Sequence, residues 1–107
     1  MFARNVSFRL KPNTLNDFNQ TFEKDTLPML RKQAGFRDEI VLAGDDKMHM
    51  TSISLWDSRE QAETYNTNAY PTVLKTLDKF VDGTPTVHVS SVVICTLHKV
   101  TPAVAAA

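Results

Sequence analysis

The chain has 107 residues, of which 42% are hydrophobic and 22% are charged, an ordinary composition for a globular protein. Twelve basic residues balance twelve acidic residues, so the formal net charge is zero. Nucleic acids and anionic membranes select proteins with a concentrated positive charge, and we therefore expect neither as a partner.

The length predicts one domain, which we place over residues 1–100, with 101–107 (TPAVAAA) as a frayed tail. Cys95 is the only cysteine, so no internal disulfide can form, and we interpret it as a structural, inert thiol. Arg4 and Asn5 stand where the apolar part of a secretory signal would lie, and no apolar run approaches the ~20 residues that span a bilayer. These features predict a cytoplasmic protein.

The first predicted strand runs from Phe2 to Leu10. Its even positions are mostly apolar, so this side faces the core. A helix then starts near Thr14, with one apolar face that must pack on a sheet. Pro28 predicts a kink or a break near Asp25 to Leu27, because proline lacks the backbone donor that continues a helix. The apolar face consists of Leu15, Phe18, Phe22, Leu27, Met29 and Leu30.

Gly35 is expected to end this helix in a left-handed conformation. Residues 36–43 form the second predicted strand, and the turn Gly44-Asp45-Asp46 joins it in a hairpin to a third strand, 48–56. Asp57 or Ser58 can cap the helix that follows, since Glu60 and Gln61 stand three positions further on.

The break after this helix is expected at residues 66–68, and Pro71 suits the first turn of the next helix. Asp82 and Gly83 are expected to close that helix, and residues 85–100 form the longest extended segment.

The element order predicts an α+β fold: a ferredoxin-like split βαβ protomer with an antiparallel sheet and helices on one face. The other face keeps apolar side chains such as Ile53 and Leu55. We therefore expect a homodimer whose sheets close on each other, with the last strand reaching across.

One face of the third strand suggests a pocket. Trp56 ends this face, the serines leave room, and methionine adapts to irregular ligands. The other interpretation makes Trp56 a core aromatic residue whose N–H meets a backbone carbonyl. The residues of this face are Met48, Met50, Ser52, Ser54 and Trp56.

Arg4 occupies the apolar side of the first strand, where an unpaired charge is costly. It either meets a carboxylate or extends past the strand end, or it faces the cleft and holds an anionic substrate. Tyr65 and Tyr70 flank a loop over the cleft, as packing residues or as proton donors. The histidines His49, His88 and His98 lack metal-ligand spacing, so we predict no metal site and interpret them as dimer or surface residues.

Three segments carry a family resemblance: the opening strand ending in KP, the helix ending in QAGF, and SLWDSREQAETYNTNAYPTVLKTL. With them the chain resembles the dimeric α+β barrel superfamily, and within it the antibiotic biosynthesis monooxygenase type of domain. The resemblance covers almost the whole chain, roughly 1–100. It implies a ferredoxin-like protomer, a dimeric barrel, and a cleft between sheet and helices. Members include cofactor-free oxygenases of aromatic polyketides, haem-degrading enzymes and proteins with no assigned activity.

The resemblance implies a cofactor-independent monooxygenase acting on a small aromatic or polyketide-type substrate. Arg4 would then favour the substrate anion, Trp56 would stack or hydrogen-bond, and Tyr65 or Tyr70 would position a carbonyl. A dimeric barrel that binds a small ligand without chemistry is the alternative, because the same residues would serve it. Haem degradation is disfavoured: Asn5 and Trp56 match the relatives in type, but no histidine follows on the helix.

Overall fold

The computed structural model describes residues 1–100, and the predicted frayed tail, 101–107, lies outside the described residues. In chain order the elements are β1 (Phe2–Leu10), α1 (Leu15–Thr21), the π-helical turn η1 (Phe22–Thr26), α2 (Leu27–Arg31), β2 (Phe36–Ala43), β3 (His49–Trp56), α3 (Arg59–Asn68), α4 (Tyr70–Leu77), the 3-10 turn η2 (Asp78–Phe80) and β4 (Val81–Ser91).

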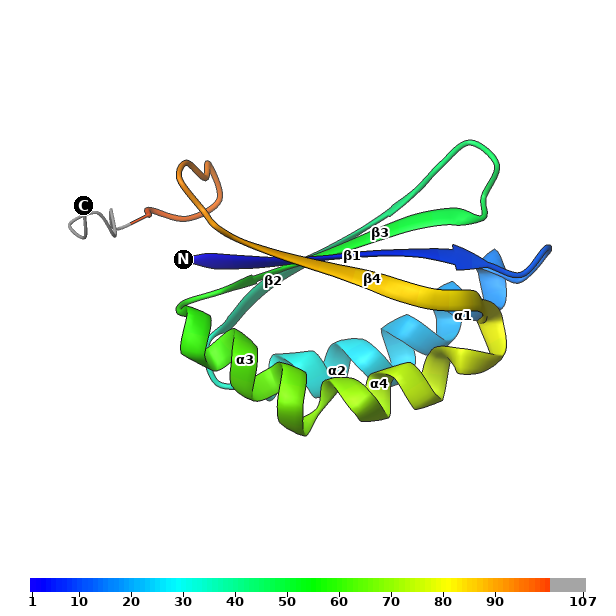
Figure 1. Cartoon of the computed structure of the whole chain (residues 1–107), viewed down its shortest axis with the longest axis horizontal. Helices are drawn as coiled ribbons and strands as arrows, with labels where there is room; N and C mark the ends of the chain where they lie inside the picture. The colour runs from blue at the N-terminus through cyan, green and yellow to red at the C-terminus, as the bar shows by residue number, and fades with distance from the viewer. Residues whose placement is uncertain (101–107) are drawn as a thin grey trace.

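The four strands form one antiparallel sheet in the order β2-β3-β1-β4. One helical segment, α1 to α2, connects β1 to β2, and the other, α3 to α4, connects β3 to β4. All helices lie on the same face of the sheet (Figure 1). The predicted α+β, ferredoxin-like protomer is therefore confirmed. The predicted alternation of β1 is confirmed too, because Phe2, Arg4, Val6 and Leu10 are buried on the side that faces the helices.

The interruption predicted near Pro28 takes the form of η1, a π-helical turn. The backbone N–H of Leu27 donates to the carbonyl of Phe22, five residues earlier, so the helix is locally widened. Pro28 explains the irregularity, since it offers no N–H to the carbonyl of Lys24. The widened turn still directs Phe22 and Thr26 into the protein, where both side chains are buried.

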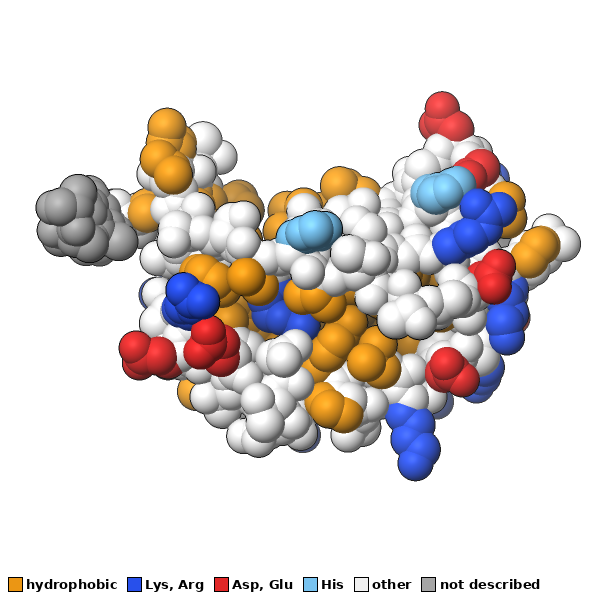
Figure 2. Space-filling model, in the orientation of Figure 1, with side chains coloured by type: hydrophobic (Ala, Val, Ile, Leu, Met, Phe, Trp, Pro, Cys, Tyr) orange, Lys and Arg blue, Asp and Glu red, His pale blue; other side chains and the backbone are white. Residues whose placement is uncertain are grey.

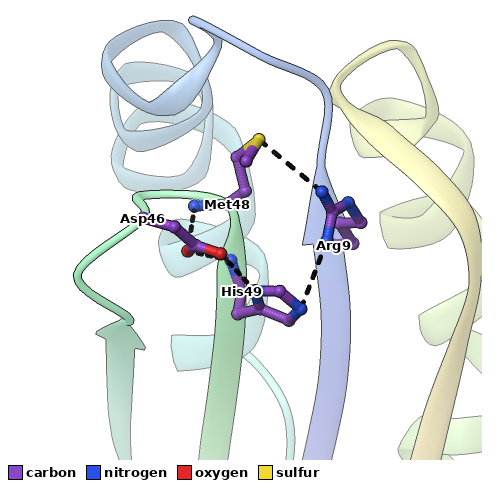
Figure 3. A network of polar contacts seen from close by, with 4 residues as sticks. All are labelled: Arg9, Asp46, Met48 and His49. Atoms are coloured by element: carbon purple, nitrogen blue, oxygen red, sulfur yellow. Dashed lines mark hydrogen bonds and ion pairs between the residues drawn. The ribbon is translucent and has the colours of Figure 1, made fainter.

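Asp46 fixes the turn between β2 and β3. Its Oδ1 accepts hydrogen bonds of 2.9 Å from the backbone N–H groups of Met48 and His49, and its Oδ2 pairs with His49 Nδ1 (Figure 3). Arg9 of β1 reaches the same cluster, with Nη1 3.2 Å from His49 Nε2 and Nη2 4.0 Å from Met48 Sδ. These hydrogen bonds hold the carboxylate in its ionised form and lower the pKa of Asp46 well below its usual range.

The start of α3 agrees with the predicted cap. Ser58 Oγ accepts a hydrogen bond of 3.2 Å from the backbone N–H of Gln61. Gln61 packs against Gly35, where an added Cβ would lie 2.0 Å from Gln61 Oε1. Gly35 has φ +83, and its carbonyl accepts from the N–H of Asp57 at 2.8 Å. Only glycine meets both the backbone and the space requirement at this position.

Two predicted boundaries of the second helical pair are wrong. Residues 66–68 are helical, and α3 ends at Asn68. Ala69 follows as the C-cap residue, and its N–H donates to the carbonyl of Tyr65 at 2.9 Å. Asp82 and Gly83 do not close α4 but belong to β4. Burial of Tyr65 on the sheet outweighs the weak helix preference of the asparagines, because helix stability in proteins comes mainly from packing of the apolar face.

The last strand is shorter than predicted, since β4 ends at Ser91 and the chain from Val92 to Val100 is not extended sheet. The register explains why. Ser91 pairs with Phe2, the first residue of β1, and the ladder stops one hydrogen bond later, where the N–H of Val92 donates to the carbonyl of Met1 at 2.9 Å.

The sheet face opposite the helices carries no helix or strand from residues 1–100, and the chain after β4 rises on that side (Figure 1). Ile40 lies opposite Ile53 on this face, and the exposed fractions of Ile40 and Leu42 are 39% and 50%. His98 Nε2 pairs with Asp38 Oδ2, which brings the segment after β4 to the end of β2. We refer to Ile40, Leu42 and Ile53 as the open face.

Candidate functional site

A cavity of about 260 Å³ lies between the sheet and the helices. Its apolar walls come from β1, η1, α2 and α4, and its central polar side chains come from β1, β2, β3, η1, α3 and α4. In Figure 2 apolar side chains gather between sheet and helices on the face shown, around a basic side chain. The polar residues most central to its chemistry are Arg4, Thr26, Glu39, Ser52, Tyr65 and Tyr70.

Arg4 is the cationic side chain of the cavity, and only 3% of it is exposed. Its Nη2 donates a hydrogen bond of 2.9 Å to Oδ1 of Asn66 on α3. Its guanidinium carbon lies 4.4 Å from the ring centroid of Tyr70 and 5.0 Å from that of Tyr65. Within residues 1–100 Arg4 forms no ion pair. Neutral groups and aromatic faces therefore make its direct contacts.

Tyr65 and Tyr70 form the aromatic wall beside Arg4, with ring centroids 6.0 Å apart. Burial raises the pKa of both phenols, and the positive charge of Arg4 opposes this shift. Both hydroxyl groups are consequently protonated at neutral pH and can donate hydrogen bonds to a ligand oxygen.

Glu39 faces the cavity from β2, where the sequence pattern gave no indication of a site residue. Its carboxylate accepts a hydrogen bond from Ser52 Oγ on β3. Burial raises the pKa of Glu39 to about 7, although the hydrogen bond from Ser52 and the charge of Arg4 both act to lower it. Glu39 can thus gain or lose a proton near neutral pH.

Thr26 lines the cavity from the π-helical turn, and only 2% of it is exposed. Its Oγ1 is buried with no hydrogen-bond partner among residues 1–100. A buried hydroxyl without a partner costs roughly 1–3 kcal/mol.

The structure brings five of the eight predicted site residues to the cavity: Arg4, Ser52, Ser54, Tyr65 and Tyr70. The other three, Met48, Met50 and Trp56, do not line the cavity. They stand at the two ends of the predicted strand face, and only its middle residues, Ser52 and Ser54, reach the cavity. Met48 contacts Arg9 at the hairpin, and Met50, only 3% exposed, lines a separate depression beneath α1.

Trp56 is fully buried and does not line the cavity. Its ring packs against Tyr65, with the ring centroids 4.9 Å apart, and edge-on against Phe36, with the centroids 5.6 Å apart. The expected partner of its N–H was a backbone carbonyl, and this detail is wrong, because Nε1 donates to Ser54 Oγ at 2.8 Å. Tyr65 therefore stands between Trp56 and the cavity.

Two polar residues at the site, Glu39 and Asn66, did not follow from the sequence pattern. A β-bulge between Phe36 and Asp38 changes the alternation of β2, so that Phe36 and Glu39 both face the helices. Asn66 was interpreted as part of a break and instead continues α3. The pairing of Arg4 with Ser54 and of Glu39 with Ser54 would have signalled this polar region, had the register been known.

The histidines lie away from the cavity. His49 joins the Asp46 turn, His98 pairs with Asp38, and His88 is paired across the sheet with Asn5. Asn5 therefore faces away from the helices, as its position in β1 predicted. Among residues 1–100 no group of three His, Cys, Asp or Glu side chains could hold a metal ion. No helix in this part of the chain is long and apolar enough to cross a membrane.

No protein-family model and no curated protein matches the chain. Solved structures share its fold, and three of them are described here. A monooxygenase from the ActVA-Orf6 gene of Streptomyces coelicolor, in complex with nanaomycin D, has 16% identity and a TM-score of 0.74 over 92% of both chains.

The second structure is SnoaB, a cofactor-independent oxygenase from Streptomyces nogalater, with 13% identity and a TM-score of 0.73 over 91% of this chain and 97% of SnoaB. The third, an antibiotic biosynthesis monooxygenase, has 16% identity and a TM-score of 0.69 over 88% of this chain and all of the other. The chain therefore has the ferredoxin-like α+β fold of the antibiotic biosynthesis monooxygenase proteins.

Proposed function

We propose that the protein binds a small aromatic substrate as its anion and oxidises it as a cofactor-independent monooxygenase. The observation that carries this proposal is Arg4, a buried cation without an ion-pair partner among residues 1–100, at the wall of an apolar cavity. A buried charge of this kind is costly unless a counter-charge arrives. A phenolate or enolate ligand supplies that charge.

The cavity suits a small aromatic ligand. Its volume of about 260 Å³ lies just below the roughly 300–1,000 Å³ range of small-molecule pockets. Val6, Leu30, Val73 and Leu77 provide apolar contacts for a ring. Glu39 interacts with Arg4 at a distance but forms no ion pair with it within residues 1–100. A fully apolar ligand would leave Arg4 without a counter-charge in direct contact, so we favour an aromatic ring that bears an ionisable oxygen.

The proposed roles follow from the proton states of the residues. Arg4 stabilises the substrate anion, and the protonated hydroxyl groups of Tyr65 and Tyr70 donate hydrogen bonds to a carbonyl of the same substrate. Trp56 supports the ring of Tyr65 from behind. In the reaction a ring methylene and O₂ give a carbonyl and water, and the substrate supplies all four electrons that O₂ accepts. The cofactor-independent activity named for SnoaB and the nanaomycin D complex of the Streptomyces coelicolor monooxygenase support this proposal.

An oxygen electrode with a panel of hydroquinones and anthrones tests the activity. We expect oxygen uptake above buffer with at least one anthrone, and strongly reduced uptake by Arg4→Met. The matched control is Arg9→Met, which removes a cation from the exposed end of β1. Thermal stabilisation by these compounds without any oxygen uptake would contradict the oxygenase and would favour a ligand-binding barrel protein.

We also propose that two copies associate through the open face. Ile40, Leu42 and Ile53 form one apolar surface. The segment that follows β4 rises on the same side of the sheet (Figure 1), and it contains the exposed apolar residues Val93 and Ile94. A second copy is the occupant we favour, because a two-fold interface lets each copy cover the same apolar patch of the other. Light scattering at micromolar concentration should then give twice the mass of one chain.

A further inference from the structure

We propose that Glu39 is the proton acceptor of the cavity and takes the phenolic proton of the bound substrate, an inference that rests on the proposed function. Glu39 lies on β2, between the cavity that contains Arg4 and the depression beneath α1. Its hydrogen bond from Ser52 fixes one side of the carboxylate. The remaining lone pairs can receive a proton from a ligand in the cavity.

The position of Glu39 results from the bulge in β2. Without it, the strict alternation of the strand would place position 39 on the same side as the open face. With it, Glu39 pairs with Ser54 and shares the helix-facing side with Arg4. Bulges often direct a side chain into a site, and this one brings a carboxylate into an otherwise mostly apolar space.

The charges around Glu39 favour reversible proton transfer. Arg4 faces it from β1, Ser52 from β3 and Tyr65 from α3, while Glu23 of η1 lines the neighbouring depression. Asp78 and Tyr70 are the other titratable groups that line the cavity. Because burial raises the pKa of Glu39 to about 7, its carboxylate is a stronger base than an exposed glutamate.

The proton transfer leaves the charge of the cavity unchanged. The phenolic O–H bond breaks, its electron pair stays on the substrate oxygen, and the proton forms an O–H bond with a carboxylate oxygen of Glu39. Before the step Arg4 is balanced by the Glu39 carboxylate at a distance, and after it by the phenolate. A buried site can accommodate such an exchange because no net charge enters it.

Anaerobic binding of 1-naphthol separates this step from any oxidation. At about pH 8 the Glu39 carboxylate is mostly ionised, whereas 1-naphthol is neutral in solution. We expect the wild type to bind it with the absorption band of the naphtholate and without proton release to the buffer. Proton release is measured from the heats of binding in buffers that differ in ionisation enthalpy. For Glu39→Gln we expect either no naphtholate band or release of about one proton per ligand.

Glu23→Gln is the matched control, because it removes a carboxylate from the adjacent depression and should behave as the wild type. The same band and the same proton count in the wild type and Glu39→Gln would overturn the role of Glu39, even if the protein oxidises anthrones. Naphtholate binding without proton release, combined with no oxygen uptake from any anthrone, would support Glu39 and reject the oxygenase. Failure of the wild type to bind 1-naphthol as the naphtholate would overturn the role of Glu39, whereas the oxygenase is accepted or rejected by the oxygen uptake with anthrones.

Discussion

Trp56 Nε1 donates a hydrogen bond of 2.8 Å to Ser54 Oγ, two residues earlier on the same face of β3. Both side chains are buried, so this contact satisfies a donor and an acceptor that would otherwise be unpaired. The bond also helps to hold the indole against Tyr65, whose ring is tilted by 32° to the indole and lines the cavity. Trp56 can therefore influence a ligand only through its neighbours.

Trp56→Phe should reduce the free energy of unfolding by about 1–3 kcal/mol, because Ser54 loses its donor and the smaller ring fills less space. The affinity for 1-naphthol should change less than about threefold, since Trp56 does not reach the cavity. Urea denaturation and a binding titration measure the two effects. Loss of binding with unchanged stability would show direct contact between Trp56 and the ligand.

Arg4→Met should weaken binding of a phenolate by at least about tenfold, or roughly 1.4 kcal/mol, because the buried counter-charge of the ligand is removed. The free energy of unfolding should stay equal or rise, since a buried cation without an ion pair within residues 1–100 is replaced by an apolar side chain. The neutral ether 1-methoxynaphthalene is the control ligand. Equal losses of affinity for the ether and the phenol would contradict a role for charge.

Thr26→Val should stabilise the protein by about 1 kcal/mol, because valine has the same shape and removes a buried hydroxyl without a partner in residues 1–100. Thr26→Ser keeps the hydroxyl and should give no gain. Thermal and urea denaturation of the three proteins measure the difference. A destabilised valine variant would mean that Oγ1 has a hydrogen-bond partner, such as a bound water.

Glu39 should make stability depend on pH. Its pKa is about 7 in the folded chain and near its ordinary value of 4.5 in the unfolded chain. Between these values the folded state binds more protons, so the free energy of unfolding falls as pH rises from 4.5 to 7, by roughly 3 kcal/mol at most. Glu39→Gln should remove this decline. Parallel pH profiles of the two proteins would show that Glu39 keeps its ordinary pKa when folded.

Leu42→Glu should convert the proposed dimer to a monomer. Leu42 is half exposed on the open face, so a charge there opposes association without disturbing the helix-facing core. Lys47→Glu, at the exposed turn beyond β2, is the control for a change of charge. Light scattering measures the mass, and a wild type that is monomeric at micromolar concentration would rule out the interface.

The sequence by itself determined the order of the elements and much of the helix-facing side of the sheet. β1 and β2 have their predicted bounds, and Ser58 caps α3 as predicted, because these features depend on local periodicity and capping. The burial of Arg4 on the even side of β1 also followed from alternation alone. These are properties of neighbouring residues, which a sequence displays directly.

Only the tertiary structure decided the composition of the cavity. The bulge in β2 brings Glu39 to Ser52, the π-helical turn carries Thr26 inward, and β4 ends where β1 offers no further partner. Trp56 is separated from the cavity because Tyr65, nine positions later, packs over it. The position of Glu39 and the end of β4 depend on pairing between strands far apart in the chain, and local periodicity carries no information about that pairing.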